Sequence, residues 1–435
     1  MSIELISLIL LFGVFALMTI GVPLSFAAGA LAVLVAYSKF GFAVIAIAQK
    51  TIYGLATEYV LISVPMFILM ASLLERSSLA KDLYDALNSI FGRVRGGVAI
   101  ITLIISVILA AMSGIIGGEI VLLGLVALPQ MLRLKYDEKL AIGVVCAGGS
   151  LGTMIPPSIV LIIYGLATDV SVQRLFIASF LPGVLLASCY LVYVLVMVRV
   201  KPDIAPDPNS TEIEPLTLQK VMKGLLPCAF LIGTVFGCIY GGVTSVTEAA
   251  GIAVFITLAI VVLRGEFSMK MLNQALIQTL RACGIIVWVT FGAAVLIAVY
   301  NLSGGQKFVS DYILGLNISP LVTIIVMMLI FVFLGCFMDW IGILLLCMPI
   351  FVPIVLKLGY DPVWFGVLFS VTMQTAFLSP PFGPAAFYLK SVAPPHITLQ
   401  RIFASLWPFM LIQLFVLTLL LAFPEIVLWL PRVLM

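Results

Sequence analysis

Apolar runs about as long as a lipid bilayer is thick recur along the whole chain, and they constrain its fold more than any other feature. Hydrophobic residues make up 63% of the 435 residues and charged residues only 9%, whereas a soluble domain carries roughly 25% charged residues. Inside lipid such runs form helices or a closed barrel, because no water satisfies the backbone. A barrel would alternate polar and apolar residues in segments of ~10, and these runs are continuous. The sequence therefore predicts an all-α polytopic membrane protein.

The chain begins with one of these runs, MSIELISLIL. It lacks a basic start and a small-residue cleavage site, so we expect a first membrane helix rather than a removed signal. The seven cysteines lie within apolar runs and form no CxxC pair. We therefore expect them to pack as small apolar side chains rather than to form disulfides or a metal site.

A proline- and charge-rich stretch at residues 199–223 divides the chain near its middle, and we interpret it as a cytoplasmic linker. The flanking halves, residues 1–198 and 224–435, carry four matching phrases in the same order. These are Leu128-Pro129 and Met348-Pro349, Tyr136-Asp137 and Tyr360-Asp361, Pro156-Pro157 and Pro380-Pro381, and lastly RLFIASFLP at 174–182 and RIFASLWP at 401–408. Four matches in one order predict an internal repeat.

The distribution of lysine and arginine predicts how the repeats lie in the membrane. If the linker is cytoplasmic, most basic residues fall on the cytoplasmic side, as expected for a multi-pass protein. The corresponding landmarks of the second half, around residues 307–319 and 357–362, then fall outside. We therefore expect two inverted-topology repeats, with both chain ends periplasmic.

Each half contains an apolar run with a break at its centre, at residues 97–131 and 320–356. Each arm of the first run is somewhat shorter than the ~20 residues of a full span. Basic residues flank both ends of that run, so a single crossing would place one basic cluster outside. We expect a re-entrant helical hairpin in each half, with tips near Ser113 and at Met338-Asp339. Two ordinary tilted spans per run are the alternative.

A helix that should break follows each hairpin, at residues 138–167 and 362–390. Two consecutive prolines remove two backbone donors and clash with the preceding turn, and nearby glycines and hydroxyls allow the chain to unwind. Lipid does not tolerate the freed carbonyls, so these segments must face protein or a water-filled cavity. Paired broken helices in two inverted halves indicate the midplane binding site of a transporter.

The breaks and tips carry the groups that bind a small hard cation and an anion. Free carbonyls and hydroxyls ligate Na⁺, and half-helix N-termini hold a carboxylate. The sodium candidates are Ser113, Gly114, Gly149, Ser150, Gly152, Thr153, Pro156, Met338, Asp339, Thr372, Thr375, Pro380 and Gly383, and the substrate candidates are Ser113, Ser158, Asp339, Ser379 and Gly383.

Two acidic residues lie near the predicted tips. Asp339 is interpreted as a buried ionisable group, which is costly in lipid and therefore a functional candidate. Its alternative role is to cap the outgoing helix arm. Glu119 is left unassigned, either solvated in the cavity or paired with an arginine of a partner.

These motifs together resemble the large membrane subunit of the tripartite ATP-independent periplasmic (TRAP) transporters. The resemblance covers nearly the whole chain. It rests on GGSLGTMIPPS at 148–158 with Tyr164-Gly165, on Thr247-Glu248-Ala249-Ala250 preceded by Ser245 in place of the usual threonine, and on Pro349, Pro353 and the GYDP phrase at 359–362. The first tip reads Ser113-Gly114-Ile115-Ile116, where the family commonly has Ser-Gly-Ser-Ser.

The resemblance implies a Na⁺-driven, elevator-type importer in the bacterial inner membrane. A periplasmic solute-binding protein would deliver a carboxylate-bearing organic solute, and a small membrane subunit of four helices would pack against the scaffold. The stretch 266–282 would suit an arm between scaffold and moving domain or a plain surface connector. Na⁺ would be the coupling ion, and no cofactor is implied.

Three other functions are alternatives to this one. A stand-alone Na⁺/dicarboxylate carrier of similar design would need no binding protein. An intramembrane enzyme would need paired acids or a buried histidine, and the only histidine, His396, lies in a predicted loop. A channel would normally need a symmetric oligomer with a repeated filter. The chain also lacks a Walker sequence, so ATP is not its direct energy source. No feature indicates nucleic-acid binding.

Overall fold

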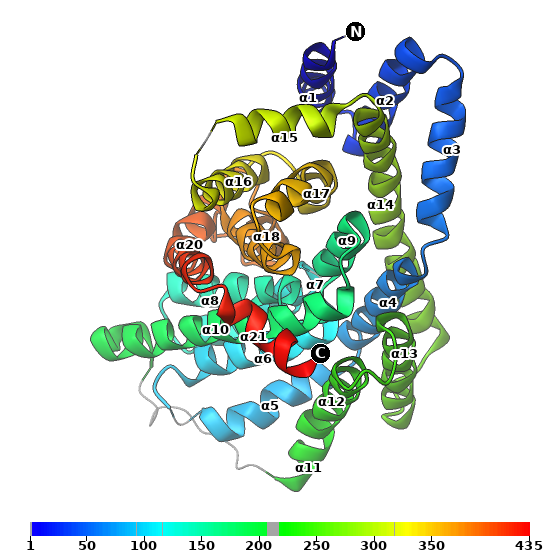
Figure 1. The fold of residues 1–435 in the computed structure, drawn as a ribbon. Helices are drawn as coiled ribbons and strands as arrows, with labels where there is room; N and C mark the ends of the chain where they lie inside the picture. Colours follow the sequence, from blue (N-terminus) through cyan, green and yellow to red (C-terminus); the bar gives the residue numbers. More distant parts are fainter. Residues whose placement is uncertain (1, 93, 115, 207–216, 317) are drawn as a thin grey trace.

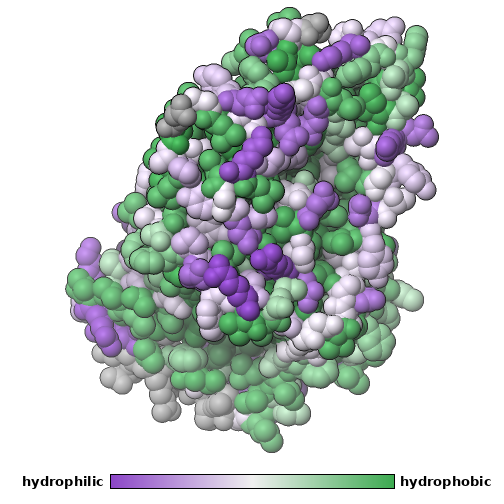
Figure 2. Space-filling model, viewed as in Figure 1, coloured by the Kyte–Doolittle hydropathy of each residue, from purple (hydrophilic) through white to green (hydrophobic). Residues whose placement is uncertain are grey.

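The computed structural model describes residues 2–92, 94–114, 116–206, 217–316 and 318–435, and their regular structure is helical throughout. Six of these helices are long and apolar enough to cross a membrane, and a seventh candidate is a pair bent by 57°. Large apolar side chains also point outward, for example Phe12, Phe255 and Phe333. Green apolar residues cover much of the face in Figure 2. The prediction of a polytopic all-α membrane protein is confirmed.

The described residues of the first half form ten α-helices, which Figure 1 shows in blue to green. They are α1 (Ile3–Thr19), α2 (Leu24–Phe40), α3 (Ala43–Ala56), α4 (Ser63–Glu75), α5 (Leu79–Phe91), α6 (Gly97–Ser113), α7 (Gly118–Arg133), α8 (Glu138–Ser150), α9 (Ile159–Thr168) and α10 (Val172–Val200). The short turns η1 (Tyr59–Ile62) and η2 (Leu151–Thr153) precede α4 and follow α8.

The second half repeats this order after η3 (Pro202–Ile204). Its helices are α11 (Leu218–Lys220), η5 (Val221–Leu225), α12 (Leu226–Tyr240), α13 (Val246–Leu263), α14 (Met269–Leu302), α15 (Gly305–Gly315), α16 (Pro320–Gly335), α17 (Trp340–Lys357), α18 (Pro362–Leu378), α19 (Pro384–Val392), α20 (Leu399–Ala422) and α21 (Glu425–Leu434).

The predicted hairpins and broken helices occur in both halves. The hairpins are α6–α7 and α16–α17, and the broken helices are α8–α9 and α18–α19. Around the predicted linker, α10 extends to Val200 and α11 begins at Leu218. The linker residues Pro208, Glu212 and Glu214 lie outside the described residues.

The two halves interlock through reciprocal helix contacts. The outgoing arm of the first hairpin, α7, packs on α19 of the second half, and α17 packs on α9 of the first half. In the same way α20 packs on α8 and α10 packs on α18. These contacts are those of two copies related by a two-fold axis, and Figure 1 shows α9 of the first half beside α17 and α18 of the second. They support the predicted repeat, and they join the halves into one core.

Two ion pairs repeat the same symmetry at the start of corresponding helices. Arg174 of α10 pairs with Asp361 at the N-cap of α18, at 3.1 Å. Arg401 of α20 pairs with Glu138 in the first turn of α8, at 3.3 Å. Exposed pairs of this kind contribute only ~0.2–1 kcal/mol each. They therefore fix the register between the halves rather than supply most of the stability.

A second set of helices lies beside this core. In Figure 1, α1 and α2 lie at one end of the molecule and α12 and α13 lie near the other, with α14 along the side. Helix α14 packs against α2, α3, α4 and α17. It is one continuous helix of 34 residues, and residues 269–282 of the stretch 266–282 form its first part. We call α1–α4 and α12–α14 the scaffold.

The Thr-Glu-Ala-Ala phrase starts a scaffold helix. The Ser245 hydroxyl accepts a hydrogen bond from the Glu248 backbone amide, and the Glu248 side chain accepts one from the Ser245 amide. This capping box satisfies two amides at the helix start. Serine caps as well as threonine does, so the departure at Ser245 preserves the local structure.

We predict opposite effects for the same substitution in two helices. A Cβ at Gly143 of α8 would lie 2.3 Å from the Phe409 ring and 2.9 Å from the Ser405 carbonyl oxygen, whereas a Cβ at Gly233 of α12 has no neighbour within 4 Å. Gly143→Ala should therefore lower the free energy of unfolding by ~1–3 kcal/mol through overpacking. Gly233→Ala should leave it equal or raise it by up to ~1 kcal/mol, because alanine favours the helix. Thermal unfolding of the detergent-purified chain measures both, and equal midpoints would contradict the α8–α20 packing.

Candidate functional site

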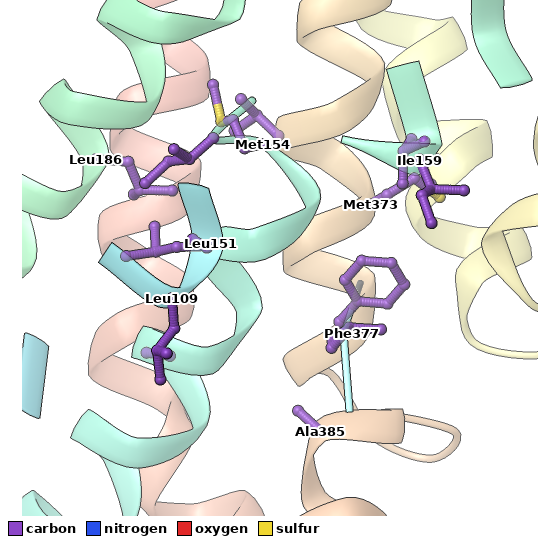
Figure 3. Close-up of a cluster of buried hydrophobic side chains, with 14 of the residues drawn as sticks. Leu109, Leu151, Met154, Ile159, Leu186, Met373, Phe377 and Ala385 are labelled. Atoms are coloured by element: carbon purple, nitrogen blue, oxygen red, sulfur yellow. The ribbon is translucent and has the colours of Figure 1, made fainter. Parts of the chain in front are cut away.

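The first helix break is fully enclosed. Helix α8 ends at Ser150, and after the single turn η2 the chain runs through Pro156 and Pro157 to Ser158, the N-cap of α9. Every residue from 151 to 158 is buried. In Figure 3, Leu151 and Met154 of this segment lie among apolar side chains that include Leu109 of α6 and Leu186 of α10. The prediction that the break faces protein rather than lipid is confirmed for this half.

The first hairpin tip closes over this break. The Gly114 carbonyl accepts a hydrogen bond from the Ile159 amide at 3.2 Å. Gly114 has φ +66°, and a Cβ there would lie 2.1 Å from the Pro157 carbonyl oxygen. Glycine alone meets both requirements, since it adopts positive φ without cost and leaves the approach open. Ile115 lies outside the described residues.

The hydroxyls of the first break donate to nearby carbonyls. Ser150 donates to Ala147 at 2.8 Å, Thr153 donates to Ser150 at 2.9 Å, and Ser158 donates to Thr153. A hydroxyl that donates its only proton keeps two lone pairs. These oxygens therefore remain available as ligands, although each side chain also satisfies the unwound backbone.

Glu119 lies beside this group and is buried, which corrects the idea that it is solvated. Its side chain is 2% exposed, and one carboxylate oxygen accepts the Ser113 hydroxyl. The other carboxylate oxygen has no hydrogen-bond partner among the described residues. A Cβ at Gly152 would lie 2.5 Å from the bonded oxygen, so the carboxylate also abuts the break. The structure therefore joins Ser113 and Gly152 through a residue that the sequence left unassigned.

The second break is more open. Helix α18 ends at Leu378 and α19 begins at Pro384, with the Gly383 amide donating to the Ser379 carbonyl at 2.9 Å. Pro380, Pro381 and Phe382 are exposed. The prolines of both breaks are joined by cis peptide bonds. The two breaks thus share one design but differ in how much of them the chain covers.

Asp339 at the second tip is exposed, which corrects its interpretation as a buried group. It occupies the N-cap position of α17. Its carboxylate faces the first amides of the helix but makes no capping hydrogen bond. Asp339 is exposed because it lies at the turn between α16 and α17, and its carboxylate remains accessible there.

A small void lies between the second tip and the second break. Its volume is about 10 Å³, and Gly335, Met338, Asp339, Phe377 and Phe382 line it together with five other residues. That volume suits one water or ion. Thr372 and Thr375 are not among the lining residues. Their hydroxyls donate to the Leu368 and Val371 carbonyls one turn earlier in α18, and Ser379 donates to Ala376.

A larger cavity, which the sequence did not reveal, separates the first tip from the scaffold. It has a volume of about 460 Å³, with Glu75 and Arg76 at the end of α4, Gln278 of α14, Gly117 and Gly118 of the tip, and Tyr388 of α19 in its wall. Gln278 donates to Glu75 at 3.1 Å, and Arg76 donates to the Ser72 carbonyl at 3.2 Å. In the sequence, the adjacent charges of Glu75 and Arg76 after an apolar run are the feature that could have indicated this cavity.

The chemistry of both tips suits a hard cation rather than a transition metal. Within the described part of the chain no three histidine, cysteine, aspartate or glutamate side chains come together. The groups at the tips are carbonyl, hydroxyl and carboxylate oxygens, which suit hard cations. The N-termini of α9 and α19 start at the breaks and carry partial positive charge, which suits an anion.

Comparison with known proteins places this arrangement in a family. The model of the family described as "Tripartite ATP-independent periplasmic transporter, DctM component" matches residues 11–426. The chain is 29% identical to the large permease protein of a C4-dicarboxylate TRAP transporter from Pseudomonas aeruginosa, over 88% of both chains. It is 31% identical to that of an ectoine/5-hydroxyectoine TRAP transporter from Ruegeria pomeroyi, over 85% of both chains. The crystal structure of the Alcanivorax borkumensis YdaH transporter has a similar fold, with a TM-score of 0.59, 16% identity and 88% of both chains covered.

We predict that Gly114→Ala destabilises the protein more than Gly359→Ala does. Both glycines have positive φ, at +66° and +82°, but a Cβ at Gly359 has no neighbour within 4 Å. Each substitution should cost roughly 1–2 kcal/mol for the left-handed backbone. Gly114→Ala should cost ~1–3 kcal/mol more, because it forces the tip off the break. Thermal unfolding of the purified variants gives the difference, and equal losses would show that the tip does not press on the break.

Proposed function

This chain belongs to the family of DctM components, the large membrane subunits of TRAP transporters, and from that premise we propose that it imports a carboxylate-bearing organic solute by symport with Na⁺. The observation that carries the proposal is the pairing of each hairpin tip with a helix break in two interlocked halves. Each pairing gathers free oxygens around unwound backbone. A secondary transporter uses such groups for its coupling ion and its substrate.

The oxygen ligands support Na⁺ as the coupling ion. The void beside Asp339 is large enough for one ion, and hydroxyl oxygens cluster at the first break. The sodium candidates fall into two groups on this basis, one at each tip. The first group is Ser113, Gly114, Gly149, Ser150, Gly152, Thr153 and Pro156, and the second is Met338, Asp339, Pro380 and Gly383. Thr372 and Thr375, in α18 before the second break, are the remaining candidates.

The helix N-termini at Ser158 and Gly383 support a carboxylate-bearing solute. Half-helix N-termini attract anions, and one relative is named for C4-dicarboxylates. The cavity of about 460 Å³ lies between the first tip and the scaffold, and its size is within the range of small-molecule sites. We assign the solute to this cavity. Ser379 and Asp339, at the second break and the second tip, lie outside the residues that line it.

The family name supports the remaining parts of the proposal. A tripartite periplasmic system implies a solute-binding protein in the periplasm and a second, smaller membrane subunit. We place this chain in a bacterial inner membrane with both ends periplasmic. The elevator mechanism has the interlocked core move against the scaffold, with α14 as the long connecting arm. The stand-alone Na⁺/dicarboxylate carrier is less favoured, because the family works as a three-part system.

We expect uptake to require an inward Na⁺ gradient. The chain, its small subunit and the binding protein encoded beside it would be reconstituted in proteoliposomes, with a radiolabelled solute found by screening that binding protein. Replacing external Na⁺ by K⁺ should lower initial uptake at least tenfold, as for loss of an obligatory ion. Uptake that proceeds equally in K⁺ would overturn the Na⁺ coupling, and uptake without the binding protein would restore the stand-alone carrier.

We expect Asp339→Asn to lower uptake without unfolding the protein. Interactions with a charged group contribute ~1.5–3 kcal/mol, so the loss should be roughly 10–100-fold. Asp311→Asn on α15, an exposed aspartate outside both tips, is the matched control and should transport normally. If the Asp339→Asn variant transports at the wild-type rate, Asp339 has no role in transport and only occupies the start of α17.

A further inference from the structure

Glu119 is a buried carboxylate whose second oxygen has no hydrogen-bond partner within the described residues. It sits in the first turn of α7, 2% exposed, between Ser113 at the end of α6 and Gly152 at the first break. An ionised carboxylate in such a place is unfavourable unless a positive charge or further donors compensate it. One hydroxyl is too little compensation, so the carboxyl is either protonated or paired with a cation that the described residues do not supply.

Protein side chains do not supply that partner. In the described ranges no lysine, arginine or histidine forms an ion pair with Glu119. The basic side chain on the cavity wall, Arg76, donates to the carbonyl and hydroxyl of Ser72. Glu75, which approaches the tip from the scaffold at Gly118, adds a second negative charge. The field around Glu119 therefore favours a cation.

We propose that Glu119 supplies the anionic ligand of a monovalent-cation site at the first hairpin tip, together with the Ser113 hydroxyl and the backbone at Gly152. This inference rests on the proposed function, and it names the ligand that gives the first site its charge. A single carboxylate with neutral oxygens suits Na⁺, whereas a Ca²⁺ site takes 6–8 oxygens and usually several carboxylates.

The position of Glu119 gives the cation a role in coupling. Ser113, Glu119 and Gly152 come from the two arms of the hairpin and from the break, so an ion among them ties the tip to the core. The same ion offsets the negative charge of Glu119 next to a cavity whose wall already carries Glu75. An anionic solute would be repelled from that cavity while both carboxylates are uncompensated. Cation binding therefore precedes and permits solute binding.

The test is ²²Na⁺ equilibrium binding to the purified full chain with its small subunit, and Na⁺-dependent thermal unfolding in NaCl against choline chloride at constant ionic strength. For Glu119→Gln we expect the half-saturating Na⁺ concentration of one site to rise at least tenfold, equivalent to 1.4 kcal/mol. In choline chloride the variant should unfold at the same temperature as the wild type or higher, because an uncompensated buried charge has been removed. Glu425→Gln, an exposed glutamate paired with Arg432, is the matched control and should behave as the wild type.

The outcomes separate this inference from the proposed function. If the wild type shows no preference for Na⁺ over choline, Na⁺ coupling itself fails. If the wild type responds to Na⁺ and Glu119→Gln responds identically, only the role of Glu119 fails. A variant that unfolds earlier by the same amount in both salts would show that Glu119 only stabilises the tip, which also overturns the proposal. If Glu119→Gln cannot be purified, Ser113→Ala replaces it and should weaken the same Na⁺ site.

Discussion

Backbone that leaves the helix inside a membrane must find other partners, and this constraint explains most of the architecture. Two consecutive prolines unwind one helix in each half, and the carbonyls and amides thus freed would be very unfavourable against lipid. The chain meets the constraint at the first break by folding the tip of a hairpin over it, with Gly114 bonded to Ile159. The hairpin is therefore part of the solution to an unwound helix, and the two elements occur together in both halves.

The interlocking of the halves extends the same solution. Because α7 packs on α19 and α17 packs on α9, each half covers the second part of the other half's broken helix. The ion pairs of Arg174 and Arg401 hold this arrangement in register at the surface. A core built this way is a single body, and the scaffold with its long helix α14 lies beside it. In the proposed elevator mechanism, the relative motion is between those two parts rather than within the core.

The two sites differ in access although they share one design. The first break is buried, and it abuts the Glu119 carboxylate, one oxygen of which has no hydrogen-bond partner among the residues that the structure describes. The second break exposes Pro380 to Phe382, with Asp339 exposed at the neighbouring tip. In the proposed mechanism, a buried carboxylate such as that of Glu119 suits a Na⁺ ion that stays with the core during transport. An open tip with an exposed carboxylate suits binding that begins from outside the chain.

The sequence by itself determined the number and kind of parts. Apolar runs, the double prolines and the four repeated phrases predicted the hairpins, the breaks and their duplication, because helix length, proline chemistry and charge distribution act over a few neighbouring residues. It also located the tip at Ser113-Gly114 and the break at 148–158. Only the tertiary structure decided which side chains meet. The burial of Glu119 against Gly152, the exposure of Asp339 and the cavity around Glu75, Gln278 and Tyr388 depend on contacts between segments far apart in the chain. Such contacts are set by how helices pack sideways, and no local pattern in the sequence records that packing.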